Sequence, residues 1–93
     1  MKPNQIPSLP RGVRIHHDKV RDAWVLLAPE RAVTLDHVAH AVLSEVDGKR
    51  SFREIVSTLA SKYQAPEDQI AKDSSGFLSA LRDRRFLDVI DAS

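Results

Sequence analysis

The stretch Ala23–Leu35 (AWVLLAPERAVTL) constrains the fold more than any other part of this chain. Its first run, Trp24–Leu27, is aromatic and aliphatic and is ended by a proline, which is typical of a strand buried on both faces. Trp24 is therefore expected in the core, with its indole N–H bonded to a carbonyl. The second run, Ala32–Leu35, fits a strand that pairs with the first through a tight turn. Three segments of helical period follow, and we expect them to cover one face of this small sheet.

The residues before this stretch predict one more strand. Residues 13–17 alternate apolar and polar side chains, as a half-buried strand does. The polar turn Asp18–Asp22 then joins this strand to the Trp24 strand in a hairpin, which gives a three-stranded antiparallel meander. Residues 1–10 contain three prolines and are predicted to be a flexible arm, mobile unless something docks on it. Residues 11–93 are predicted to form a single domain, in which 87–90 add a short strand or pack as a tail.

Capping residues mark the three helices. Asp36 is a good N-cap for the first, which we expect to end at Asp47-Gly48. Ser51 and Glu54 form a capping box for the second, and Pro66 is suited to the first position of the third. Gly76, within the third helix, costs about 1 kcal/mol relative to alanine. The predicted fold is α+β and winged-helix-like: a three-stranded antiparallel sheet followed by three helices.

Composition removes several classes of function. With 14 basic and 13 acidic residues the formal net charge is +1, which argues against general binding to nucleic acid or to anionic membranes. There is no cysteine, and no apolar run approaches the roughly 18 residues of a membrane span, so we expect a cytoplasmic protein. No serine lies in a nucleophile elbow, and His37 and His40 lack a third ligand at metal-site spacing. We therefore expect no enzyme activity, no cofactor and no metal.

The strand Ala32–Leu35 is predicted to be an open sheet edge. It carries neither charge nor proline, the features with which proteins usually protect an edge. The first strand has such protection in Arg11, Arg14 and the preceding Pro10. A peptide could add to the open edge as a further strand, with nearby cations steering an acidic peptide: Arg31, Lys72, Arg82, Arg84 and Arg85. The alternative, that the third helix or the tail covers this edge, stays open from the residues alone.

A series of short motifs resembles one family in order and spacing from about Leu9 to Leu87. The matching elements are Trp24–Glu30, Leu35, Asp47-Gly48-x-Arg50-Ser51, Glu54-Ile55, Leu59, Tyr63, Ala65-Pro66, Asp73 and Phe77-Leu78-x-x-Leu81. They are similar to the pyrroloquinoline quinone biosynthesis protein D (PqqD) proteins, a leader-peptide recognition domain family. The resemblance implies a non-catalytic peptide chaperone that binds the precursor peptide PqqA and presents it to the radical S-adenosylmethionine (SAM) enzyme PqqE.

The resemblance also implies where the peptide lies. In that family it is held as an added strand against the third strand, with the third helix as the other wall. Carried over to this chain, the peptide-binding residues are Arg31, Ala32, Val33, Thr34, Leu35, Ile70, Ser74, Phe77, Leu78, Leu81 and Arg82. The chain departs from the family pattern at Ser74, where a small apolar residue is common, and at Arg85, where glycine is.

Two further hypotheses follow from the same residues. A winged-helix DNA-binding transcription regulator shares the helical layout, but the third helix begins with Glu67 and Asp68 at the end that would enter the groove. A domain-swapped homodimer is also expected at high concentration. Gly76 could let the third helix break and exchange between chains, and the proline-rich arm is a second candidate for exchange.

Overall fold

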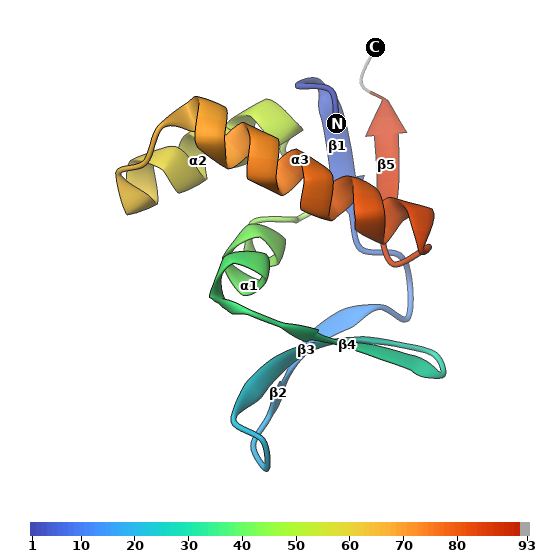
Figure 1. The fold of residues 1–93 in the computed structure, drawn as a ribbon. Coiled ribbons are helices and arrows are strands. Elements are labelled where there is room, and N and C mark those ends of the chain that lie inside the picture. Colours follow the sequence, from blue (N-terminus) through green and yellow to red (C-terminus); the bar gives the residue numbers. More distant parts are fainter. Residues whose placement is uncertain (92–93) are drawn as a thin grey trace.

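The computed structural model describes residues 1–91 and has two layers, a three-stranded sheet and three helices (Figure 1). The sheet is antiparallel in the order β2-β3-β4, with bounds Arg14–Asp18, Ala23–Ala28 and Arg31–Leu35. The helices all lie against one of its faces; they are α1 (His37–Ser44), α2 (Phe52–Tyr63) and α3 (Glu67–Asp83). The predicted α+β fold, a three-stranded antiparallel sheet followed by three helices, is confirmed.

One hydrophobic core fills the space between the sheet and the helices. Every helix contributes a stripe to it, and the sheet contributes the inward-facing side chains of β3 and β4. The most deeply buried members, almost without exposed surface, are Leu26, Leu43, Ile55, Leu78 and Phe86. Burial of this kind contributes about 25 cal/mol per Å² of apolar surface, so this core fixes how the helices sit over the sheet.

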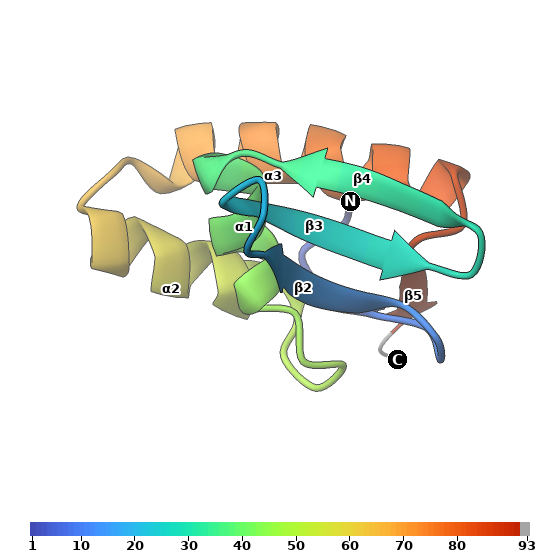
Figure 2. The same ribbon diagram turned by 90° about the horizontal axis from the view of Figure 1, so that it is seen from below.

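The expectation that the Trp24 strand is buried on both faces is wrong. Along β3 only Leu26 is fully buried, and Val25 and Leu27 on the opposite face are half-buried. The reason is that all three helices cover the same face, so the other face is open to solvent (Figure 2). Trp24 is also not a core residue, since 38% of it is exposed at the end of the strand beside α1.

The N-terminal residues form a second sheet, which the expectation of a flexible arm missed. Strand β1 (Gln5–Ser8) pairs antiparallel with β5 (Asp88–Asp91), so that Ile6 lies opposite Ile90. Pro7 is tolerated because β1 is an edge strand that pairs on one side only, and its ring is fully buried. The arm is held further where the N–H of Arg53 donates to the carbonyl of Pro3 at 3.0 Å.

The helix caps agree with the sequence except at two boundaries. The Asp36 carboxylate accepts from the N–H of Ala39 at 2.7 Å, and the α2 capping box, Ser51 with Glu54, is complete. Helix α1 ends at Ser44, three residues before the predicted stop, and Gly48 takes its positive φ of 74° in the loop that follows. Pro66 is the N-cap of α3 rather than its first residue.

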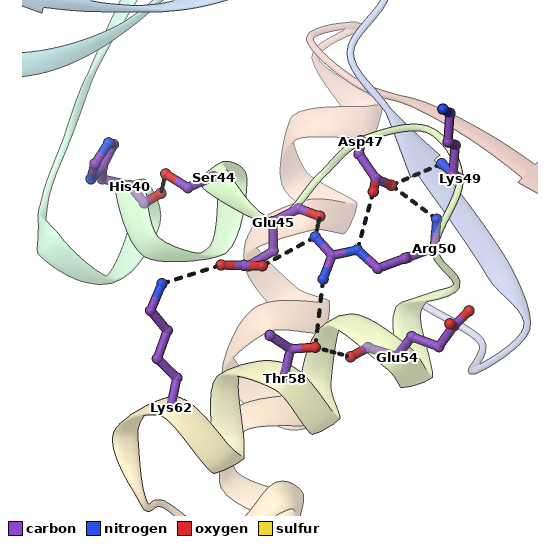
Figure 3. Close-up of polar contacts among 9 residues, drawn as sticks. All are labelled: His40, Ser44, Glu45, Asp47, Lys49, Arg50, Glu54, Thr58 and Lys62. Atoms are coloured by element: carbon purple, nitrogen blue, oxygen red, sulfur yellow. Dashed lines mark hydrogen bonds and ion pairs between the residues drawn. The ribbon is translucent and has the colours of Figure 1, made fainter.

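Arg50 joins the loop after α1 to α2 (Figure 3). Its guanidinium donates to the carbonyl of Glu45 at 2.7 Å and to the Glu45 carboxylate at 3.1 Å. The backbone N–H groups of Arg50 and Lys49 donate to the Asp47 carboxylate at 2.9 Å each, and together they lower the pKa of Asp47 to about 2. Lys62, in the last turn of α2, lies 3.5 Å from the same Glu45 carboxylate. Arg50 also donates to the Thr58 hydroxyl of α2 at 3.5 Å, so these bonds link the end of α1 and the loop after it to α2.

Candidate functional site

Strand β4 has a free edge. It pairs with β3 on one side, and no other strand pairs with it within residues 1–91. The connection Pro29-Glu30 has two residues, with a φ of 64° at Glu30, so the flanking pair Ala28–Arg31 is hydrogen-bonded. Hydrogen-bonded and non-hydrogen-bonded pairs alternate along an antiparallel ladder. The N–H and C=O groups of Ala32 and Thr34 therefore point away from β3, toward the free edge.

Helix α3 runs alongside this edge (Figure 2). Of the predicted wall residues on α3, Ile70 and Phe77 are half-buried and offer apolar surface. Ser74, Leu78 and Leu81 are buried in the core, with exposures of 2%, 0% and 3%. All five predicted residues lie on the inward-facing side of α3, where Ile70 and Phe77 are partly exposed and the other three are buried in the core.

On β4, the predicted site residues alternate between the two faces of the sheet. Leu35 is buried and Val33 is half-buried, and both pack on the core. Ala32 and Thr34 are exposed on the open face, and their backbone groups point to the free edge. The inward side chains of this strand, Val33 and Leu35, therefore pack in the core, whereas the backbone groups of Ala32 and Thr34 face the free edge.

Arg31 makes contacts within the chain. Its guanidinium donates to the carbonyl of Arg84 at 2.7 Å and lies 4.2 Å from the centroid of the Phe86 ring. Arg31 thus ties the first residue of β4 to the end of α3 and closes that end of the space between them. Arg82 is exposed and lies 3.9 Å from the Asp83 carboxylate, a weak pair that leaves it available as a rim charge.

A pocket of about 550 Å³ opens at the other end of β4, where α1 begins. Its walls come from the first turns of α1, the end of α2 and the first half of α3, and include Val38, Tyr63 and Ile70. Val38 is 64% exposed and Tyr63 is 55% exposed, the largest apolar exposures on these helices. Helical spacing places both residues in line with the apolar positions of their helices, so the sequence alone predicts that they lie in the core. Both residues lie at the edge of the apolar stripe of their helix. That position could have indicated that their side chains face a groove between helices and not the core.

Trp24 connects this pocket to the sheet. Its ring stacks on His40, a pocket residue, with centroids 4.1 Å apart and planes 13° apart. His17 packs on Trp24 at 4.8 Å, and its Nε2 lies 3.2 Å from the Asp22 carboxylate. The fluorescence of Trp24, the only tryptophan of the chain, should therefore report changes in the pocket.

Residues 1–91 show two further negative results. They contain no group of three or more histidine, cysteine or acidic side chains placed to hold a metal ion. Within the same range, no helix is both long and apolar enough to cross a membrane.

Comparison with known proteins identifies the family. The family model for coenzyme PQQ synthesis protein D (PqqD) matches residues 23–87, which include β3, β4 and all three helices. The chain belongs to the PqqD family. The PqqA binding protein of Rhizobium meliloti (strain 1021) is 41% identical over 87 residues, which cover 94% of this chain and 89% of that relative. This degree of likeness over nearly the whole length confirms the resemblance seen in the motifs.

Two solved structures share the fold of this PqqD-family chain. One is the solution structure of the PqqD part of Methylobacterium extorquens PqqCD, described as a functional, stand-alone recognition element for ribosomally synthesized and modified peptides. It is 41% identical, has a TM-score of 0.76, and the match covers 95% of this chain and 99% of that one. The second, TbiB1 in complex with a leader peptide, has a TM-score of 0.72 at 24% identity, with 87% of this chain and 94% of that one covered, and shows the fold alone.

Proposed function

We propose that this PqqD-family chain is a non-catalytic peptide chaperone of PQQ biosynthesis that binds the precursor peptide PqqA as a strand added to β4. The observation that carries the proposal is the free β4 edge, where the N–H and C=O groups of Ala32 and Thr34 face outward beside α3. Two relatives give support: one is named for binding PqqA, and the other is described as a peptide recognition element.

The backbone supplies the affinity of such a complex. The outward groups of Ala32 and Thr34 offer two donors and two acceptors, and each net hydrogen bond is worth about 0.5–1.5 kcal/mol. On the other side of the peptide, Ile70 and Phe77 present apolar surface from α3. Ser74, Leu78 and Leu81 hold this wall in place from the core. Strand addition of this kind takes affinity from the main chain and specificity from side-chain contacts.

Exposed cations beside the β4 edge would steer the approach of the peptide. Arg82, Arg85 and Lys72 are exposed on or just after α3, and cations there raise the association rate of an acidic peptide more than its affinity. Arg31 contributes by its contact with Arg84, which holds β4 and α3 together. In the cytoplasm, the bound PqqA would then be presented to the radical SAM enzyme PqqE.

We also propose a swapped homodimer at high concentration. Helix α3 is continuous through Gly76, whose position is open: beyond the neighbouring residues and the local helix backbone, no atom lies within 4 Å of an added Cβ. The β1–β5 pair joins residues from opposite ends of the chain, so β1 can be exchanged with a second copy without losing its ladder.

The proposal is tested by titrating ¹⁵N-labelled protein with synthetic PqqA. We expect amide shifts and new exchange protection at Ala32 and Thr34, with smaller shifts along Ile70–Leu81. A random-sequence DNA duplex at low salt, where phosphate contacts are strongest, serves as the control and should leave the spectrum unchanged. Shifts that avoid β4 while the peptide binds would refute strand addition, and a tight complex with the duplex would favour the transcription regulator instead.

A further inference from the structure

Three arginines gather where β4 begins and α3 ends. Arg31 is the first residue of β4, Arg84 is the C-cap of α3, and Arg85 follows it. The Arg31 guanidinium donates to the carbonyl of Arg84 at 2.7 Å, and Figure 2 shows the start of β4 and the end of α3 side by side. We call these three residues the arginine cluster. It lies at one end of the free β4 edge, and α1 begins at the other end.

Packing holds two members of the cluster in place. The guanidinium carbons of Arg31 and Arg84 lie 4.2 Å and 5.3 Å from the centroid of the Phe86 ring, which is fully buried. Cations near an aromatic ring are attracted by its quadrupole, and arginine makes this contact without giving up its N–H donors. Arg31 uses a single N–H on the Arg84 carbonyl, so its other donors remain available to a ligand.

The cluster has no acidic partner within residues 1–91. All three arginines are exposed, and none of them forms an ion pair with a carboxylate in this part of the chain. The neighbouring Arg82, by contrast, lies 3.9 Å from the Asp83 carboxylate. Like charges that are held together without a counter-charge repel one another. An anion bound among these arginines would relieve that repulsion.

The backbone at Arg85 gives an independent indication. Arg85 has a φ of 64°, and the N–H of the next residue, Phe86, donates to the carbonyl of Leu81 at 2.9 Å. This is the Schellman ending of a helix, in which the left-handed residue is usually glycine because a Cβ is unfavourable there. An arginine at this position lowers backbone stability, so its side chain is expected to have a function of its own.

Charge of the opposite sign lies toward the other end of the edge. The first half of α3 carries Glu67, Asp68 and Asp73 and a single cation, Lys72. Asp73 also lines the pocket beside the end of β4. A peptide along β4 therefore meets cations where the strand begins and a net negative charge where it ends. An acidic side chain of the peptide is attracted to the first end and repelled from the second.

We propose that the arginine cluster binds one carboxylate side chain of the peptide paired on β4, and that this contact fixes the register of the added strand. The inference rests on the proposed function, because strand pairing brings the carboxylate to the cluster. Main-chain pairing depends little on sequence, so an extended peptide can shift along β4 in steps of two residues. A carboxylate held by guanidinium hydrogen bonds at one end selects one of these registers. This is a contact of the bound complex, beyond the steering that rim cations provide.

Arg85→Gly separates binding from stability. Glycine suits the left-handed backbone, so Arg85→Gly should keep or raise the melting temperature. It should nevertheless weaken PqqA binding roughly two- to fivefold, the range of an exposed ion pair, and Arg84→Gln should do the same. Arg21→Gln is the matched control, because it removes the same charge from the turn between β2 and β3. It should bind as wild type does.

A double-mutant cycle identifies the carboxylate. Each aspartate and glutamate of PqqA is changed to asparagine or glutamine, and its affinity is measured against wild type and Arg85→Gly by calorimetric titration. One position should lose its effect in the variant protein, because its partner is already absent. The ¹⁵Nε–H signals of the arginine cluster should shift with unmodified PqqA and should not shift with the PqqA variant at that position.

The outcomes separate this inference from the proposed function, because Thr34→Pro tests strand addition alone. If Thr34→Pro weakens binding and Arg84→Gln and Arg85→Gly do not, the carboxylate site is refuted and strand addition stands. If the arginine variants slow association equally for every PqqA variant, the cluster only steers the peptide and the carboxylate site is likewise refuted. A lower melting temperature of Arg85→Gly with unchanged binding would show that the arginine serves only the end of α3. If wild type does not bind PqqA, both proposals fail together.

Discussion

Proline substitutions at two adjacent residues of β4 should have opposite effects. Val33 pairs with Leu26 in a hydrogen-bonded pair, so its N–H belongs to the sheet, whereas the N–H of Thr34 points to the free edge. Val33→Pro should lower the free energy of unfolding by about 1–3 kcal/mol, since it removes a ladder donor and leaves the Leu26 carbonyl unpaired. That is a large share of the roughly 5–15 kcal/mol that holds a domain together. Thr34→Pro removes a donor that the free protein does not use and should leave the fold intact.

The effect of Thr34→Pro on binding follows from the same geometry. It deletes one main-chain bond to the peptide and places a ring where the peptide approaches. PqqA affinity should fall tenfold or more, which corresponds to about 1.4 kcal/mol. Thr34→Val keeps the N–H and should bind within about twofold of wild type, a difference small on the scale of one hydrogen bond. Ala32→Pro, at the other outward position, should behave as Thr34→Pro does.

Circular dichroism melting and calorimetric titration with PqqA provide the readouts. If Val33→Pro remains folded and Thr34→Pro unfolds, the assignment of outward groups is wrong. If both variants fold and bind as wild type does, the peptide does not pair with β4. Loss of binding in Thr34→Val would shift the explanation from the backbone to the hydroxyl group.

Four further substitutions test the fold around the site. Ile55→Ala, at a position with 0% exposure, should lower the free energy of unfolding by about 2–5 kcal/mol in urea titrations; a smaller loss would show that the core collapses there. Gly76→Ala should raise stability by about 1 kcal/mol and, if α3 exchanges at this point, should reduce the dimer fraction in sedimentation. Arg31→Gln should lower the free energy of unfolding by about 1 kcal/mol, because the hydrogen bond to the Arg84 carbonyl is lost. An unchanged melting point would show that this bond does not contribute to stability. The pKa of Asp47 is lowered from 3.8 to about 2, so its stabilisation is present above pH 4 and is lost as pH falls toward 2. Asp47→Asn should therefore show a shallower loss of melting temperature over that range.

Local signals predicted the main fold well. The Asp36 cap, the Ser51–Glu54 capping box and the proline-ended run at Trp24 each depend on neighbours within a few residues, and the structure contains all of them. The free β4 edge was predicted from the absence of charge and proline, which is also a local property. The β1–β5 sheet was missed because it joins residues 86 apart, Gln5 and Asp91. The prolines in this N-terminal segment also led to the prediction of a flexible arm.

The site was predicted in part. Periodicity placed Ile70, Ser74 and Phe77 on one face of α3, but it cannot tell a surface residue from one buried beneath it. That depends on how closely α3 packs against the sheet, which the core sets through residues far apart in the chain. Trp24 was expected in the core because of its apolar neighbours. It is instead partly exposed at the end of β3, where one face of its ring stacks on His40 of α1.

The pairing of β1 with β5 brings the two ends of the described chain to the same corner of the molecule. In Figure 1, β1 and β5 lie above α3, whereas β4 lies below it. A protein fused at either end would therefore be tethered at one place, without a linker crossing the peptide groove. Tethering of this kind raises the effective concentration of a partner to about the millimolar range for a short flexible linker. Under the proposed function, fusion at either end would therefore leave the β4 edge open to the peptide.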